Sequence, residues 1–280
     1  MPQPASLPDA SGEPSADATP LRPESQSHLE RAIDDREFTP YFQPIVSLDT
    51  GDMLAAEALV RWNPSDGDSV PPSGFIGLAE ESGLIEPLGR QVLDRAARLL
   101  KQWGDAAPAR VHVNVSPSEL GSDARLATEL RRVSREEGVH LGRLCVEISE
   151  RQARVTSEQV RRLRELGVQV ALDDFGTGYA SYSLLAELPI TDLKLDGSLV
   201  RSLDSSPRHR TVVRRIVDLG RDLGIRVVAE GVQTAAQAHR LREAGCRVGQ
   251  GFLFGQPREP AEFEQTLLTS IPRRSNGSSG

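Results

Sequence analysis

The feature of this sequence that most restricts its fold is a repeated alternation of short apolar runs with longer segments of helical periodicity. In the clearest helical segment, basic residues lie on the other faces and apolar residues recur at Leu88, Val92, Ala96, Leu99, Leu100 and Trp103. Alternation of this kind is typical of parallel βαβ units. The runs that we predict to be strands are residues 41–46, 54–60, 111–115, 144–148, 168–172, 193–195, 227–229 and 246–249.

The number of these strands favours one closed barrel over an open doubly wound sheet, because about eight strands with their helices fit in roughly 240 residues. The chain also lacks the glycine-rich dinucleotide fingerprint of the open sheet. Three helical segments end at Gly167, Gly224 and Gly245, which we expect to be left-handed C-caps. We therefore predict an α/β fold, a single TIM-like (β/α)8 barrel over residues 27–270 with a flexible tail at each end.

The two tails differ from this body in composition. Residues 1–26 are rich in Pro, Ser, Ala and acidic residues and contain almost nothing to bury, which is typical of disorder. Residues 271–280 have a similar character. We predict that neither tail forms part of the packed barrel.

The charge of the chain excludes some classes of partner. A formal net charge of −7 and a pI of about 5.4 leave no basic field for a nucleic-acid polymer or an anionic membrane. No apolar stretch approaches the ~20 residues of a membrane span, and the N-terminus has no signal-peptide pattern, so we expect a cytoplasmic protein. Cys145 and Cys246 lie in apolar runs and are expected to be buried core residues.

Polar residues that can bind a metal or exchange a proton end one predicted strand after another. In a parallel barrel the C-terminal ends of all strands open onto one face, so these residues converge there. We predict that the active site lies at this face. In chain order the residues are Glu57, Asn114, Glu147, Asp173 with Asp174, Lys194, Glu230 and Gln250.

Taken singly, several of these residues have simpler explanations. An acid at the end of a strand is often the N-cap of the next helix, and Asp174, followed by Phe175 and Gly176, fits a cap or a turn equally well. Lys194 and Asp196 could lie on the solvated face of an alternating strand. The joint pattern is harder to explain in this way.

Carboxylates gathered at one barrel mouth would repel each other unless cations were bound or protons taken up. Metal binding resolves this conflict. The donors are oxygen atoms and the five histidines show no paired spacing, so Mg²⁺ or Mn²⁺ is favoured over Zn²⁺. Two ions ~3.5–4 Å apart suit hydrolysis of a phosphodiester. The five carboxylates are Glu57, Glu147, Asp173, Asp174 and Glu230.

At these residues the sequence resembles the EAL-domain family of cyclic di-GMP phosphodiesterases, whose name-giving motif is Glu57-Ala58-Leu59. Three letters alone are not specific, but eight further motifs in the family's order are. The resemblance covers about residues 27–268. The motifs are YFQPIV at Tyr41, FIGLAEESGLI at Phe75, VNVSP at Val113, VEISE at Val146, DDFGTGYAS at Asp173, DLKLD at Asp192, VVAEGVQT at Val227 and GQGFLFGQP at Gly249.

The resemblance implies a role for each matching residue. One metal would be held by Glu57, Asn114, Glu147 and Asp173, and the second by Asp173 and Asp174 with help from Glu230. Catalytic roles would fall to Glu57, Glu230, Lys194 and Glu150, with Lys194 orienting or deprotonating the attacking water and Glu150 pinning the DDFGTGYAS loop. Substrate contacts would come from Gln43, Arg61, Gln250 and Asp196.

The implied reaction is hydrolysis of one phosphodiester bond of cyclic di-GMP, giving linear pGpG and lowering the second-messenger level. The cofactors would be two divalent cations, Mg²⁺ or Mn²⁺, whereas Ca²⁺ would bind without supporting turnover. A homodimer would pair through the loop from Asp173 to Ser181. Two departures from the family pattern are Ser149 in place of Thr and Gln233 in place of Glu, and the second leaves the rate open.

Two other functions fit parts of the sequence. A catalytically silent cyclic di-GMP receptor acting through a partner protein would share the motifs, but such chains typically lack metal ligands or the lysine, and this chain keeps them all. An unrelated metal-dependent barrel enzyme of metabolism would require the ordered motifs to be accidental.

Deletion of residues 1–26 is expected to leave hydrolysis within about threefold of the full chain, because so little apolar surface there can dock on the barrel. The rates of the full and truncated chains, measured side by side, test this. A tenfold loss, equivalent to ~1.4 kcal/mol of barrier, would show that the tail takes part in the reaction.

Overall fold

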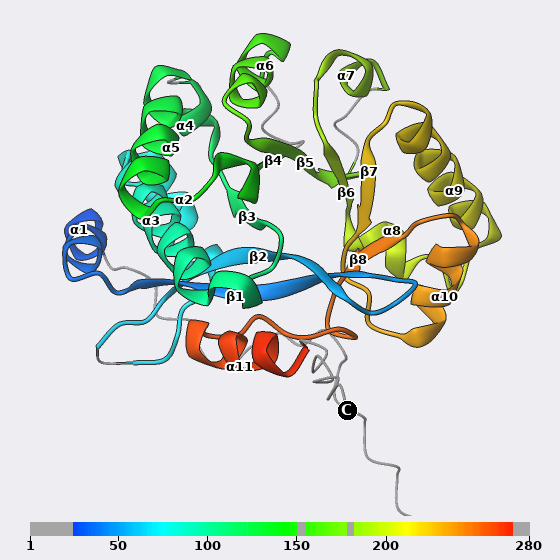
Figure 1. Ribbon diagram of the computed structural model, residues 1–280, viewed down its shortest axis with the longest axis horizontal. Coiled ribbons are helices and arrows are strands. Elements are labelled where there is room, and N and C mark those ends of the chain that lie inside the picture. Colours follow the sequence, from blue (N-terminus) through cyan, green and yellow to red (C-terminus); the bar gives the residue numbers. More distant parts are fainter. Residues whose placement is uncertain (1–24, 66, 122, 150–154, 178–181, 271–280) are drawn as a thin grey trace, which may run out of the picture.

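The computed structural model of the protein describes residues 25–65, 67–121, 123–149, 155–177 and 182–270. Eight strands form a closed barrel in chain order, surrounded by helices, as predicted (Figure 1). The predicted tails lie outside the described ranges except for residues 25 and 26, where the first helix begins. The strands are β1 (Phe38–Ser47), β2 (Met53–Trp62), β3 (Val111–Asn114), β4 (Leu144–Ser149), β5 (Gln169–Phe175), β6 (Asp192–Leu195), β7 (Arg226–Ala229) and β8 (Val248–Gln250).

One strand departs from the all-parallel arrangement that we predicted. β1 is antiparallel to both of its neighbours, β2 and β8, whereas the remaining pairs are parallel. The reason lies in the connection from Ser47 to Met53, a tight turn with Gly51 at φ 80°, which is too short for the crossover that a parallel pair needs. As a result, Gln43 pairs with Glu57 from the middle of β1 and does not reach the barrel mouth from a strand end.

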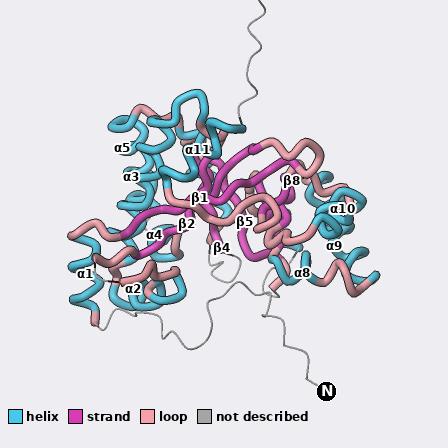
Figure 2. Tube along the Cα trace, turned by 90° about the horizontal axis from the view of Figure 1, so that it is seen from below, coloured by secondary structure: helices cyan, strands magenta, loops and turns pink. Residues whose placement is uncertain are grey.

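The helices form a ring around the strands. Figure 2 shows the strands in the middle, with α3 and α5 on one side and α9 and α10 on the other. The helices are α1 (Gln26–Asp34), α2 (Ile76–Ser82), α3 (Ile85–Trp103), α4 (Pro117–Gly121), α5 (Asp123–Glu137), α6 (Ser157–Glu165), α7 (Tyr182–Glu187), α8 (Gly197–Arg201), α9 (Pro207–Asp222), α10 (Ala235–Glu243) and α11 (Pro260–Ser270). Short 3-10 turns occur at Pro72–Gly74, Gly104–Ala106 and Leu141–Arg143.

The helix predicted from apolar spacing is α3, which buries the predicted face against the barrel. At its end, Trp103 packs edge-on to Phe42 of β1 at 4.9 Å between ring centroids and tilted against Phe263 of α11 at 5.4 Å. This aromatic cluster holds the first and last parts of the fold together. Among the described helices, none combines the length and apolar character that a membrane span requires.

The predicted glycine caps and buried cysteines are both confirmed. Gly167, Gly224 and Gly245 have φ of 90°, 70° and 88°, the left-handed region in which a side chain would be strained. Each therefore ends a helix just before a strand begins. Cys145 and Cys246 are buried free thiols.

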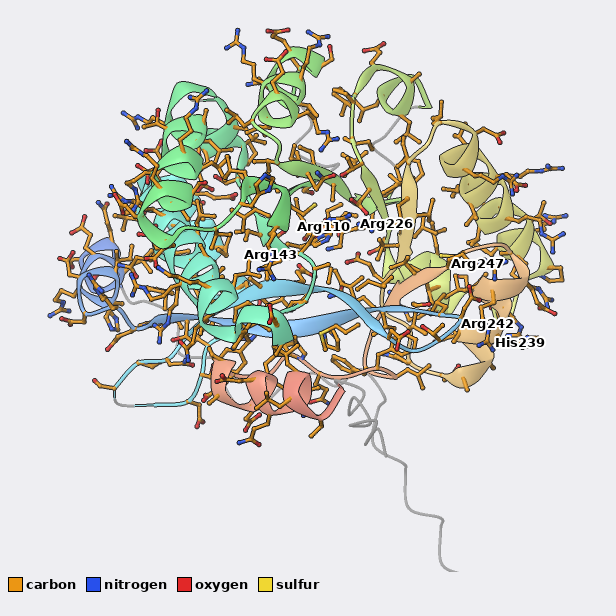
Figure 3. All side chains as sticks on the ribbon, in the orientation of Figure 1. Arg110, Arg143, Arg226, His239, Arg242 and Arg247 are labelled. Atoms are coloured by element: carbon orange, nitrogen blue, oxygen red, sulfur yellow. The ribbon has the colours of Figure 1, made fainter. Side chains whose placement is uncertain are left out.

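The amino-terminal end of the barrel is basic. Arg110, Arg143 and Arg226 lie at the starts of β3, β4 and β7, over the ring of strands in Figure 3. Arg226 forms an ion pair with the fully buried Asp192, and Arg143 donates to the Pro108 carbonyl at 3.0 Å. This end is tied together by polar contacts, and the acidic residues of the predicted site lie at the opposite end.

Candidate active site

The carboxyl ends of the strands bring together all six predicted metal ligands and Lys194. Strand alternation explains their direction, because side chains at every second position of a barrel strand point inward. In β3, for example, Val111 and Val113 face the surrounding helices, so Asn114 points into the barrel mouth. The same alternation directs the last polar residues of the other parallel strands toward one point.

Lys194 is the centre of the site and is completely buried. Its Nζ lies 2.8 Å from Glu147 Oε2 and 2.8 Å from Glu230 Oε1. It also lies 3.3 Å from Glu57 Oε2 and 3.3 Å from Asp173 Oδ1. One ammonium group therefore faces carboxylates from four different strands, and the alternative that placed Lys194 on a solvated strand face is wrong.

Amide side chains fix the orientation of Glu57. Asn114 Nδ2 donates to Glu57 Oε1 at 2.9 Å, and Gln250 Nε2 donates to Glu57 Oε2 at 2.7 Å. Gln250 Nε2 also contacts Gln43 Oε1 at 2.9 Å, and Gln43 in turn donates to the Gly255 carbonyl at 3.0 Å. Gln43 and Gln250 are both buried, and in this structure they support Glu57 through this chain of hydrogen bonds.

Asp173 and Asp174 both face the site although they are adjacent in a strand. Neighbouring strand residues normally point to opposite faces, but Asp174 has φ 59° and the pairing of β5 with β6 shifts register between Leu172 and Phe175. The Asp174 N–H donates to Asp173 Oδ1 at 2.9 Å, which holds this turn. The turn therefore directs the Asp174 carboxylate toward the predicted site, and a turn residue here can also be a metal ligand. Carboxylate oxygens of Asp173, Asp174 and Glu230 lie within 4.8 Å of one another.

The electrostatics of the cluster favour a bound cation. Burial raises the pKa of Glu147 and Glu230 well above the usual range and also raises that of Asp173. Burial acts against the charge of Lys194, but its carboxylate neighbours outweigh it and raise the lysine pKa well above normal. Burial likewise opposes ionisation of Glu57, yet Lys194 and the amide donors lower its pKa to about 2. One lysine thus compensates only part of the acidic charge.

The donor set fits a hard divalent cation. The carboxylates of Asp173, Asp174 and Glu230 are oxygen ligands of the kind that Mg²⁺ and Mn²⁺ prefer. The five carboxylates and one lysine carry 5 − 1 = 4 negative charges if all are ionised, and two divalent ions would balance that charge. The chemistry of the residues therefore agrees with a metal centre.

Comparison of the sequence with models of protein families shows which family has this site. The EAL domain family model matches residues 26–257, which is most of the chain. The chain belongs to the EAL family. Among known EAL proteins it is 39% identical over 245 residues to the cyclic di-GMP phosphodiesterase PA2567 of Pseudomonas aeruginosa, covering 85% of this chain and 42% of that protein.

Other relatives show a similar relationship. The cyclic di-GMP phosphodiesterase PdeR of Escherichia coli is 36% identical over 252 residues, which cover 88% of this chain and 38% of PdeR. The chain therefore spans about two fifths of the length of these relatives. The solved structure of the PaMucR phosphodiesterase with c-di-GMP has a TM-score of 0.79 and 33% identity, covering 85% of this chain and 98% of that one.

Some residues predicted from the EAL resemblance lie outside the carboxylate cluster. Arg61, near the end of β2, donates to the Val60 carbonyl at 3.0 Å and lies 5.9 Å from the Tyr41 ring centroid. Asp196 is the N-cap of α8 and accepts from the Ser198 N–H at 2.9 Å, so its substrate contact stays a prediction. Glu150 lies outside the described residues.

Two further predictions concern the loops of the EAL barrel mouth. The dimer contact through the loop from Asp173 to Ser181 stays a prediction, since residues 178–181 are outside the described ranges. Gln233 has an exposed side chain, and its backbone N–H donates to Gln237 Oε1 at 2.8 Å at the start of α10. The effect of Gln233 on rate also stays a prediction.

One polar residue of the EAL site was missed by the sequence reasoning. His112 is completely buried, and its Nδ1 lies 2.8 Å from Glu147 Oε1. Burial lowers its pKa to about 3, so the ring is neutral. The spacing of the five histidines disfavours a zinc site but says nothing of a histidine that contacts a ligand. The signal that could have found His112 is its position two residues before Asn114, on the same inward face of β3.

Proposed function

We propose that this EAL protein hydrolyses cyclic di-GMP to linear pGpG with Mg²⁺ or Mn²⁺ as cofactor. The observation that carries the proposal is the convergence of four carboxylates on the buried Lys194. The relatives described as cyclic di-GMP phosphodiesterases, and the PaMucR complex with c-di-GMP, support the same ligand. A cytoplasmic location agrees with this function, since the substrate is an intracellular messenger.

The predicted ligands form two sets, one for each of two ions, and the sets share Asp173. Glu57, Asn114, Glu147 and Asp173 would hold the first, and Asp173, Asp174 and Glu230 would hold the second. When bound, the ions would supply positive charge to the phosphodiester and make a water molecule a better nucleophile. Asp173 belongs to both sets, and its carboxylate is held by Lys194 and by the Asp174 N–H.

Lys194 would orient the attacking water, and its positive charge would stabilise the negative charge of the phosphate. Its raised pKa keeps the ammonium protonated in the metal-free site, which favours orientation over proton removal. Attack of the water oxygen on one phosphorus breaks the bond from that phosphorus to a ribose O3′. The O3′ leaves as a hydroxyl that carries one proton of the water. The second phosphodiester is untouched, so the product is linear.

A cavity beside the metal ligands can accept part of the nucleotide. It has a volume of about 360 Å³, touches Glu57, Asn114 and Asp173, and has an apolar wall that includes Ile76 and Leu88. Apolar walls with a few polar groups are typical of small-molecule sites. Arg61 would bind a phosphate through its planar pair of donors, because it follows Glu57 on the same strand.

The test is ion-dependent turnover. With Mg²⁺ or Mn²⁺ the protein is expected to convert cyclic di-GMP into pGpG, seen by product chromatography. Ca²⁺ is larger and a poorer activator of water, so it should support binding by calorimetry but little or no hydrolysis. Tight binding without pGpG in Mg²⁺ and Mn²⁺ would replace the enzyme proposal with the receptor function.

A further inference from the structure

His112 occupies a place inside the barrel where an apolar residue would be expected. In register it is level with Cys145, one layer below the pair formed by Asn114 and Glu147. From there its ring reaches diagonally to Glu147, the neighbouring-strand residue one layer closer to the mouth. Its side chain is completely buried, as is that of Glu147. A polar group placed this deep requires a specific contact.

The hydrogen bond with Glu147 determines which ring nitrogen of His112 carries a proton. Glu147 must be ionised to bind a cation and then only accepts hydrogen bonds, so Nδ1 carries a proton and donates to Glu147 Oε1. His112 Nε2 has no partner among the described residues and is left as an acceptor. The other tautomer would bury an unsatisfied N–H and turn a lone pair toward the carboxylate. Both are unfavourable, whereas the assigned tautomer leaves only the Nε2 acceptor without a partner among the described residues.

Glu147 is consequently held from two sides. Lys194 Nζ contacts Oε2 at 2.8 Å and His112 Nδ1 contacts Oε1 at 2.8 Å, so both carboxylate oxygens are oriented. The two holds differ in one respect. Lys194 is shared with three other carboxylates, whereas His112 Nδ1 contacts Glu147 alone among the described residues.

We propose that His112 is a positioning residue that sets the rotamer of Glu147 for metal binding. This inference rests on the proposed metal-dependent function. A glutamate has three rotatable side-chain bonds, and each must be fixed before its oxygen meets an ion at a defined place. A donor behind the carboxylate fixes them in the folded protein, before the ion arrives. Groups that orient metal ligands in this way typically change affinity or activity by about 10–100-fold when removed.

The experiment compares two substitutions of similar size that differ in whether they keep a hydrogen-bond donor. His112→Leu keeps an apolar volume in the barrel but has no donor. His112→Asn retains an N–H close to the former Nδ1 position. We expect His112→Leu to bind Mn²⁺ at least about tenfold more weakly by calorimetry, and His112→Asn to stay within about threefold of the unmodified protein. The Mn²⁺ concentration for half-maximal hydrolysis should shift in parallel, with the KM for cyclic di-GMP unchanged.

A third variant controls for packing. Val213→Ala removes volume from a completely buried position on α9, outside the ring of strands. It should lower the melting temperature without changing Mn²⁺ affinity, since neither Lys194 nor any predicted metal ligand lies on that helix. This control separates loss of stability from loss of ligand orientation.

The outcomes distinguish this inference from the function on which it rests. Folded His112→Leu that binds Mn²⁺ like the unmodified protein would overturn the positioning role, and so would folded His112→Asn with a tenfold loss. Failure of the unmodified protein to hydrolyse cyclic di-GMP would instead overturn the proposed function. If His112→Leu does not fold, His112→Phe takes its place, because it keeps a ring in the barrel but also has no donor.

Discussion

Replacing Lys194 with methionine is expected to destabilise the metal-free protein by about 3 kcal/mol or more, because removing one partner of a buried ion pair leaves the other charge uncompensated. Here four carboxylates lose their shared ammonium group. Proton uptake by those carboxylates offsets part of the cost, so the lower end of the range applies. The melting temperature in a chelating buffer, measured for both proteins, gives the effect.

Metal should restore much of the stability of the Lys194→Met protein, because bound cations replace the missing charge and bind only the native state. Binding of cyclic di-GMP in Mg²⁺ should survive, whereas hydrolysis should fall about 100-fold or more through loss of water orientation. Lys101→Met is the matched control, since Lys101 is exposed on α3. Equal melting temperatures for metal-free Lys194→Met and the unmodified protein would refute this charge balance.

Replacing Glu57 with alanine is expected to remove turnover, by about 1000-fold or more, while the barrel stays folded. The loss corresponds to several kcal/mol of barrier, the scale of a metal's contribution to charge stabilisation. Glu57 is a predicted ligand whose two oxygens are held by Asn114 and Gln250, and its neighbours lie at the mouth, above the apolar layer of the barrel. Product chromatography beside thermal unfolding, both with Mn²⁺, measures the two effects.

Glu57→Gln separates charge from packing in the same experiment. The amide fills the same space but lacks a carboxylate, so turnover should be lost here as well. Glu165→Ala, an exposed change at the end of α6, should leave turnover unaltered. Normal hydrolysis by folded Glu57→Ala would show that Glu57 is not a required metal ligand.

Much of this protein could be predicted from patterns between neighbouring residues. Each of the eight strands is visible as an apolar run, and the face of α3 is visible in the spacing of its apolar residues. The EAL family could be recognised because its motifs are short and occur in a set order. These features depend on residues close in sequence, where periodicity and turn chemistry act directly.

The sequence did not predict the direction of β1. An apolar run of the same length can pair in parallel or antiparallel, and only the short turn at Gly51 excludes the crossover. It also left the choice for Asp174 open between a turn and a metal site. In the structure the left-handed backbone at Asp174 forms the turn and also places its carboxylate near those of Asp173 and Glu230, so the metal role stays a prediction.

The strands, the family of the chain and most of the polar side chains of the site could be read from the sequence. The complete burial of Lys194 among four carboxylates and the contact of His112 with Glu147 could be seen only in the folded barrel. The physical reason is that burial and charge depend on contacts between distant strands. Lys194 and Glu57, for example, meet through barrel closure, and no local pattern encodes the 3.3 Å between their charged atoms.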